Sequence, residues 1–540
     1  MSPELAQLIA ARRKRRSVGS LALILHAHLP FVRHPEVAES FEEDWLFEAI
    51  TETYIPLLVM LQRLHAEGIP CQLTLSITPP LCAMLQDELL RARYLRHLQR
   101  SIALAEREIE RNRRQPEVEE LARFYFELLT ETRRRFVEEW HCDLLSAFRR
   151  LRDLGVLEII GSAATHGLLP LLVNSPEAVR AQVLIGCDVF REVFGAEPSG
   201  FWLPECAYTP ELDRFLQEAN IRWFVLDAHA LAFAKPRPSR AIYAPCFTPA
   251  GSAAFARDPD SSRQVWSAES GYPGDPVYRE FYRDVGFDLP PATVFPESTL
   301  QTARFTGLKY HRVTGREGEK AIYHRARAEE AVQAHAAHFL ACRRQQLREL
   351  QSHDFDPIIV MPFDAELFGH WWFEGPLFLE HFIRQAAAAG DELQLTTPGE
   401  YLKAHATQEV VVPAASSWGD GGYAAVWLDQ TNAWVYPHLH AAARQMIQVA
   451  LVHAKKADAL EERVLQQMAR ELLLAQSSDW AFLIRSGTAR HYATTRTNDH
   501  LRRFQMLYEQ LRHGAVDEPF LGECEMRDNL FPNLSWRHYL

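Results

Sequence analysis

Short apolar runs alternate with long amphipathic stretches over most of this chain, and that alternation limits the possible folds more than any other feature. The apolar runs are too short for helices and are rich in Val, Ile, Leu, Phe or Trp, as buried parallel strands are. They cover residues 21–25, 72–77, 157–161, 200–203, 223–226, 358–362 and 393–396. Stretches with helical spacing lie between them, including 42–64, 176–194, 325–350 and 375–389. This pattern predicts a parallel α/β fold.

Seven strand candidates favour a distorted (β/α)7 barrel over a short open sheet. Two stretches interrupt the alternation. Residues 86–151 are dense in Leu, Arg and Glu at helical spacing, which predicts a helical insertion after the second strand. Residues 228–309 are rich in Gly, Pro and aromatic side chains and lack clear periodicity. Because a loop of that length in a compact protein is usually functional, we expect it to border an active site.

The alternation of apolar runs and helical stretches ends where the predicted barrel ends. Residues 409–415 have the character of a linker, and residues 437–456, 458–476 and 498–512 have helical spacing. We therefore expect a catalytic barrel over residues 19–408 and an all-helical C-terminal domain over residues 409–540. Residues 1–18 contain a basic run at positions 12–16 and are expected to form a solvated extension.

Charge and cysteine content exclude several classes of protein. The 540 residues carry a formal net charge of −12, which gives no general electrostatic reason to bind nucleic acid or an anionic membrane. No apolar run approaches the roughly 20 residues that a membrane helix needs. The 8 Cys form no C-x-x-C pair and no zinc spacing, so they are expected to be reduced core residues. We expect a cytoplasmic protein.

Polar residues follow five of the predicted strands. The carboxyl ends of the strands form the active face of parallel barrels, so these side chains are expected to converge there. A single such residue is more often structural, but five convergent cases favour a functional site. The residues are His26, His28, His166, Glu205, Asp227, His229 and Asp364.

Glu205 and Asp364 are the best candidates for a catalytic pair. Each closes an apolar strand and has aromatic neighbours, which remove water from a carboxyl group and raise its pKa, as a general acid requires. Two facing carboxyl groups can cleave a glycosidic bond, one as nucleophile and the other as acid/base. The structural alternative is that Asp364 caps a helix and its aromatic neighbours belong to the core.

A metal site is the rival chemistry. His26, His28, His166 and Asp364 offer a ligand set for zinc with an open position. Against this, Glu205 stands where a metal-dependent amidohydrolase usually places a lysine, and no later His follows a strand. Metal content and activity after chelation distinguish the two. A sugar-binding protein without catalysis is a further alternative, which the presence of both carboxyl groups disfavours.

The motifs that carry these residues resemble glycoside hydrolase family 57, and within it the branching-enzyme subgroup. The resemblance covers nearly the whole chain after about residue 18. Its family motifs are 26–30, 161–166, 202–208, 363–372 and 397–402. The subgroup is indicated by residues 264–269 followed by 271–275, and by residues 417–419 with Trp427.

The resemblance implies a (β/α)7 barrel with a helical insertion and a helical C-terminal domain. It implies a retaining double displacement on an α-1,4-glucan without a metal, with Glu205 as nucleophile and Asp364 as general acid and base. His26, His28 and His166 would hold sugar hydroxyls, and Asp227, His229 and Arg257 are weaker candidates for binding the substrate. Tryptophans expected to line the glucan groove are Trp45, Trp266, Trp371, Trp418 and Trp427. For Trp418 and Trp427 the alternative is core packing.

One intermediate leads to different products. Attack by water gives an α-amylase, attack by a sugar 6-hydroxyl gives an α-1,6 branch, and attack by a 4-hydroxyl gives a 4-α-glucanotransferase. The outcome depends on how well the site excludes water and positions the acceptor. Tyr243 and Phe255, in the long loop, are candidates for shielding the intermediate. Branching is the first hypothesis, and hydrolysis or 4-α-transfer is the nearest alternative.

Overall fold

The computed structural model describes residues 19–267, 270–314, 320–351 and 355–540. The expected basic extension, residues 1–18, lies outside the described residues, as do Ala268 and Glu269 of the subgroup motif.

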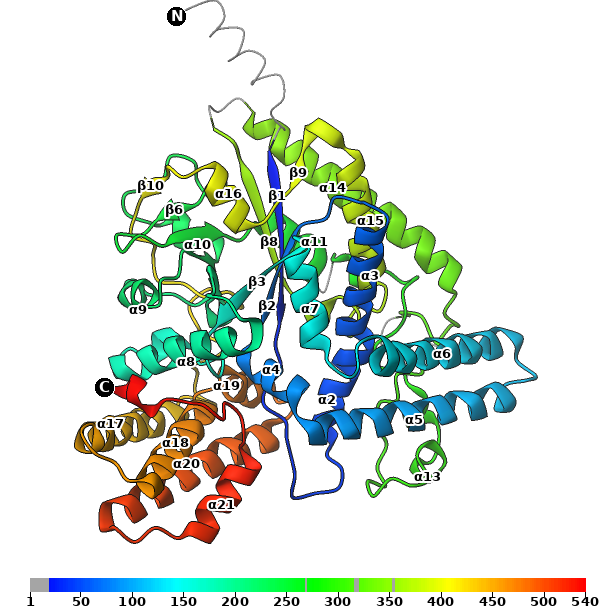
Figure 1. The fold of residues 1–540 in the computed structure, drawn as a ribbon. Coiled ribbons are helices and arrows are strands. Elements are labelled where there is room, and N and C mark those ends of the chain that lie inside the picture. Colours follow the sequence, from blue (N-terminus) through cyan, green and yellow to red (C-terminus); the bar gives the residue numbers. More distant parts are fainter. Residues whose placement is uncertain (1–18, 268–269, 315–319, 352–354) are drawn as a thin grey trace, which may run out of the picture.

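Seven parallel strands form the centre of the molecule, in the order β7-β5-β4-β3-β2-β1-β8 (Figure 1). A parallel bridge joins Arg257, which follows β7, to Val360 in β8, and the N–H of Asp258 donates to the Val360 carbonyl at 2.8 Å. The sheet thus curls until its two ends meet, which confirms the predicted distorted (β/α)7 barrel. The strands are β1 (Ser20–Ala27), β2 (Leu73–Ile77), β3 (Leu157–Ser162), β4 (Gly200–Trp202), β5 (Trp223–Leu226), β7 (Ala253–Ala256) and β8 (Ile358–Asp364).

One predicted barrel strand was wrong and one was missed. In the predicted strand 393–396, only β9 (Gln394–Leu395) pairs, and it lies against β1 outside the ring. The seventh barrel strand is β7, inside the segment expected to be a loop. That segment also holds β6 (Cys246–Phe247), which pairs with β7 and with β10 (Glu409–Val410) at the edge of the sheet.

Alternate side chains of the strands fill the barrel interior, as the two-residue period of a strand requires. Phe255 belongs to this interior, and its ring meets the ring of Trp223 edge-on at 5.8 Å. Gly200 makes room for Trp223, because a Cβ at residue 200 would lie 2.4 Å from that indole. Other buried members are Ala22, Ile24, Ile160, Trp202, Val225, Ala253, Ile358 and Val360.

Helices surround the barrel and extend from it (Figure 1). The predicted helix 42–64 is three segments: α2 (Phe41–Ala49), a π-helical turn η1 (Ile50–Tyr54) and α3 (Ile55–Ala66). In the expected insertion, α5 (Glu88–Arg111) and α6 (Pro116–Arg134) run side by side away from the sheet, followed by α7 (Leu144–Asp153). The remaining long helices are α8 (Pro176–Phe194), α14 (Arg325–Leu350) and α15 (Gly375–Ala388), all close to their predicted bounds.

The C-terminal helices group together at one end of the barrel (Figure 1). Both α18 (Ala459–Ala475) and α19 (Ser478–Ser486) pack against α20 (Arg490–His513), while α17 (Val435–His453) contacts α18 and α20. The group also contains α21 (Glu518–Arg527). None of the described helices has the length and apolarity that a membrane crossing requires.

The segment expected to be a linker is an extended strap along the barrel, here defined as residues 409–418. Its backbone pairs with successive barrel loops: Val412 with Lys235 in both directions, the N–H of Ala414 with the carbonyl of Ala230, and Ser416 with Tyr208 in both directions. The strap ends where the N–H of Trp418 donates to the carbonyl of Glu205 at 2.8 Å. The strap therefore carries the chain from the sheet edge to the end of β4.

Candidate active site

Glu205 follows β4 in a short 3-10 turn with left-handed backbone angles, φ 62° and ψ 22°. That conformation costs a non-glycine residue about 1–3 kcal/mol, so the surroundings must hold it. Trp418 Nε1 donates to Glu205 Oε2 at 2.7 Å, and the Ser478 hydroxyl donates to Oε1 at 3.0 Å. Two segments that come much later in the chain thus fix the carboxyl group in a buried position.

Asp364 is the last residue of β8 and lies in register with His26 on β1. Burial raises the pKa of Asp364 to about 7, the negative charge of Glu366 adds to this effect, and His28 and Arg257 oppose it. Burial also raises the pKa of Glu205 to about 7, where the hydrogen bond from Trp418 opposes the shift and the charge of Asp364 adds to it. The charge of Asp364 thus disfavours ionisation of Glu205, so the state with Glu205 ionised and Asp364 protonated is favoured over the state with both ionised.

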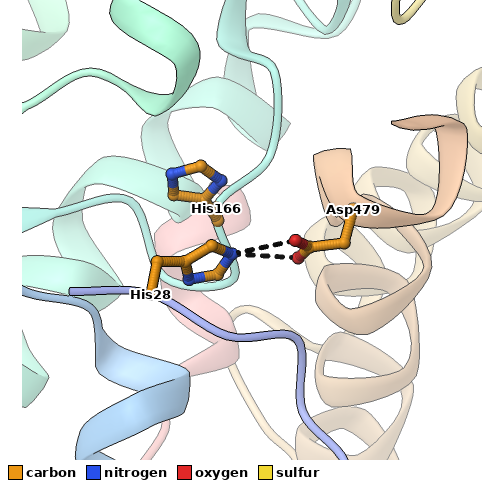
Figure 2. A group of neighbouring side chains, drawn as sticks. All are labelled: His28, His166 and Asp479. Carbon is orange, nitrogen blue, oxygen red and sulfur yellow. Dashed lines mark hydrogen bonds and ion pairs between the residues drawn. The ribbon is translucent and has the colours of Figure 1, made fainter. Parts of the chain in front are cut away.

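Three histidines stack beside the carboxyl pair. The rings of His28 and His166 lie 3.8 Å apart at 19°, and His26 lies over Trp202 at 4.4 Å (Figure 2 shows the first pair). His26 Nε2 and His166 Nε2 are 3.0 Å apart. Burial lowers the pKa of His26 and of His166, so both rings are neutral at pH 7 and can each donate and accept a hydrogen bond.

Asp479 reaches the histidines from the N-terminus of α19, so the helical C-terminal region completes the site (Figure 2). Its Oδ2 lies 3.0 Å from His28 Nε2. Burial opposes ionisation of both groups, but the charge and hydrogen bond of Asp479 raise the pKa of His28, and His28 lowers the pKa of Asp479 to about 2. Ser478 links Glu205 to His166, because its hydroxyl also lies 2.9 Å from His166 Nδ1.

Three residues of the site were not predicted from the sequence: Glu366, Ser478 and Asp479. Glu366 lies within a quoted motif but was not distinguished from Asp364. It accepts hydrogen bonds from the Tyr54 hydroxyl and from the N–H of His28, and burial raises its pKa to about 7. In the sequence, Ser478 and Asp479 are recognisable only as the start of a helix. Asp479 lies 451 positions from His28, so no local motif links it to the site.

Among the described residues at this site, His28, His166 and Asp479 offer possible metal-ligand atoms within 4.8 Å of one another. This set differs from the rival hypothesis, because it contains Asp479 and lacks both His26 and Asp364. Each ring nitrogen of His28 and His166 already lies within hydrogen-bond distance of a protein atom. The two rings are stacked, so their in-plane lone pairs run nearly parallel and do not converge on one ion. The arrangement suits hydrogen bonds to hydroxyl groups better than metal coordination.

The weaker candidates Asp227, His229 and Arg257 also come together. His229 Nδ1 lies 3.1 Å from Asp227 Oδ1, and Arg257 Nη1 donates to Asp227 Oδ2 at 3.4 Å. The guanidinium of Arg257 lies over the indole of Trp418, 5.4 Å from the ring centroid. Arg257 thus contacts Trp418, which in turn binds Glu205.

The five tryptophans have different surroundings. Trp418 contacts Glu205, whereas Trp427 is only 3% exposed and packs under the same loop against Gly419. Trp371 and Trp266 are 51% and 39% exposed, and Trp371 stacks on Phe281 at 4.4 Å. Trp45 is partly buried and meets Tyr492 edge-on at 5.9 Å.

Neither proposed shielding residue lies over the carboxyl pair. The carbonyl of Tyr243 accepts from the N–H of Ile358, the first residue of β8, whereas Asp364 is the last. A strand of this length separates its ends by about 20 Å, so Tyr243 lies at the opposite end of the barrel. Phe255 packs inside the barrel.

Comparisons with known proteins agree with this geometry. The family model for glycosyl hydrolase family 57 matches residues 22–414, and the model for the C-terminal part of 1,4-α-glucan branching enzymes matches residues 438–539. The 1,4-α-glucan branching enzyme TK1436 of Thermococcus kodakarensis is 33% identical over 95% of this chain and 77% of its own.

Two crystal structures resemble the whole chain. The α-amylase AmyC from Thermotoga maritima is 42% identical with a TM-score of 0.90, covering 96% of this chain and 99% of that one. The branching enzyme from Pyrococcus horikoshii is 34% identical with a TM-score of 0.86, covering 97% of each chain. The family match spans most of the barrel and both of its carboxyl-bearing strands, and the chain therefore belongs to glycosyl hydrolase family 57.

Proposed function

We propose that this protein is a 1,4-α-glucan branching enzyme that cleaves an α-1,4 bond and transfers the released chain to a sugar 6-hydroxyl. The convergence of Glu205, Asp364 and Trp418 at the carboxyl ends of β4 and β8 carries the proposal. The match of residues 438–539 to the C-terminal part of branching enzymes supports it, as do the branching-enzyme relatives.

In the proposed retaining mechanism, Glu205 attacks the anomeric carbon while protonated Asp364 donates its proton to the departing glycosidic oxygen. The C–O bond breaks and a covalent glycosyl-enzyme forms. The acceptor 6-hydroxyl then attacks the same carbon, and Asp364, now ionised, takes the hydroxyl proton. Two inversions leave the α configuration unchanged.

The remaining candidates are proposed to bind the glucan. His26, His28 and His166 hold hydroxyl groups next to the cleaved bond, and Asp227, His229 and Arg257 act beside Trp418. The exposed rings of Trp266 and Trp371 offer stacking surfaces for sugars, with Trp45 and Trp427 in supporting positions. We assign catalysis to residues 19–408 and completion of the site to the helical region 409–540.

A cytoplasmic role in glycogen or similar α-glucan metabolism is also proposed. The eight cysteines are unpaired in the structure, as is usual in a reducing compartment.

The second candidate is a hydrolytic α-amylase of the same family. The 42% identity to AmyC favours it, since that structure is described as an α-amylase. Both enzymes would share the glycosyl-enzyme and differ only in whether water or a sugar attacks it.

Incubation with amylose followed by proton NMR distinguishes the candidates. We expect new α-1,6 linkages; reducing ends without such linkages would instead identify a hydrolase. Glu205→Gln and Asp364→Asn should each abolish turnover and leave circular dichroism unchanged, because neither substitution removes packing volume. Near-normal turnover in either folded variant would contradict the assigned roles.

A further inference from the structure

The loop that carries Trp418, here called the Trp418 loop (residues 417–427), folds tightly on itself at the mouth of the site. The N–H of Ser417 donates to the carbonyl of Gly422 at 2.8 Å, and the Ser417 hydroxyl accepts from the N–H of Ala424 at 2.7 Å. Its stem is the strap, which ends at Glu205. The position of the indole over Glu205 therefore depends on what holds the tip of the loop.

His229, in the short helix α10 (Ala228–Ala232) that follows β5, holds that tip. Its Nε2 lies 2.8 Å from the carbonyl oxygen of Gly422, and its Nδ1 lies 3.1 Å from Asp227 Oδ1. A carbonyl and a carboxylate both accept, so the ring donates from both nitrogens when it makes both bonds. Asp227 orients the ring from the other side through Nδ1. Arg257 extends this chain of contacts, since it binds Asp227 and lies over Trp418.

Gly422 allows the close approach. It has φ +74°, and a Cβ there would lie 2.9 Å from His229 Cε1 and 3.1 Å from Nε2. The next residue, Tyr423, meets the His229 ring edge-on at 5.1 Å. His229 and Gly422 thus fit each other closely across 193 positions of the chain.

We propose that His229, oriented by Asp227, is a positioning residue that latches the Trp418 loop over Glu205 and so determines how the glycosyl-enzyme divides between a sugar acceptor and water. The inference rests on the proposed function. With either acceptor, the Glu205–carbon bond breaks, the acceptor oxygen bonds to the anomeric carbon, and its proton goes to Asp364. A displaced loop admits water to that carbon and removes a surface that orients the acceptor chain.

His229→Phe tests the latch, because it retains a ring beside Tyr423 and loses both hydrogen bonds. The measurement is the number of α-1,6 linkages formed per reducing end released from amylose. We expect this ratio to fall about three- to tenfold, the effect of losing the single hydrogen bond that joins residue 229 to the loop. His229→Gln, whose amide can donate to the Gly422 carbonyl, should restore the ratio toward that of the wild type.

His538→Phe is the matched control. His538 Nε2 pairs with Asp188 at 2.7 Å, and both His538 and His229 have side chains 21% exposed, but His538 lies in the C-terminal turn η9 (Trp536–Tyr539) against α8. It should retain the wild-type ratio. Gly422→Ala disturbs the same contact from the loop side and replaces His229→Phe if that variant does not fold.

An unchanged ratio in a folded His229→Phe or Gly422→Ala variant overturns the latch, as does an equal fall in His538→Phe. If the wild type forms no α-1,6 linkages, the proposed function fails instead. The latch is then judged from transfer onto added maltose relative to hydrolysis, with the same expectations for each variant.

Discussion

At the scale of single residues, burial sets the pH range in which the carboxyl pair can work. Glu205 must be ionised to attack and Asp364 protonated to donate, and both have pKa values of about 7. Each group also responds to the charge of its neighbours. The pH dependence of kcat/KM should therefore be bell-shaped, with an acid limb set by Glu205 and an alkaline limb set by Asp364.

Glu366→Gln tests this account. The substitution removes a negative charge that raises the pKa of Asp364, so that pKa falls. A general acid is active below its pKa, and the alkaline limb of kcat/KM should therefore move to lower pH. The control is Glu380→Gln, a similarly buried carboxyl on α15 that pairs with Arg63 and Arg384. An unmoved alkaline limb, or an equal shift in the control, would show that Glu366 does not tune Asp364.

Residue-level prediction is possible where the chemistry is local. Glu205 and Asp364 each end an apolar run and have aromatic neighbours in the sequence, so each can be recognised from its own motif. Asp479 and Ser478 have no such motif, because their function comes from the fold that brings α19 against His28 and His166. Contacts between distant segments leave little trace in one sequence.

At the scale of elements, the strap shows how an irregular segment can be as fixed as a strand. Its residues lack periodicity, which explains the expectation of a linker, yet its amides pair with barrel loops. The missed strand β7 has a related cause, since the sequence Ala253-Ala254-Phe255-Ala256 is poor in strand-forming residues and is held by its neighbours β5 and β6. Long helices such as α8 and α14 were predictable because their period is intrinsic to the sequence.

Hydrogen exchange of the strap amides measures how strongly these backbone hydrogen bonds protect them. The N–H groups of Val412, Ala414, Ser416 and Trp418 donate to barrel carbonyls at 2.8–3.1 Å, so we expect their exchange to be slowed by at least about a hundredfold relative to an unstructured peptide. Mass spectrometry of peptides that span residues 409–418 provides the measurement. Exchange at the rate of an unstructured peptide would show that the strap is a free linker.

At the scale of the whole molecule, several buried carboxyl groups share a raised pKa. The pKa values are about 7 for Asp44, Glu205, Asp364 and Glu366 and about 8 for Glu48, with burial the largest cause in each. In the unfolded chain these groups lose their protons near pH 4. The folded protein therefore binds more protons on these groups at neutral pH than the unfolded chain does.

Thermal unfolding should reveal this linkage. A group whose pKa is raised by folding contributes stability that is lost as the pH rises through the folded value, so Tm should fall between about pH 7.5 and about pH 8.5. The buried histidines with lowered pKa values oppose this fall near pH 6.5, where the unfolded chain still binds protons, but they contribute little above about pH 7.5, where they are neutral in both states. Differential scanning calorimetry provides the test, and Glu48→Gln should flatten the slope near pH 8. A constant or rising Tm would contradict the account.

The order of the catalytic groups along the chain has a consequence for biosynthesis. Asp479 is made 451 residues after His28, and Glu205 receives its contacts from Trp418 and Ser478 only after both have left the ribosome. A nascent chain can therefore hold every barrel strand and still lack a complete centre. We therefore expect no catalytic activity until α19 has emerged from the ribosome.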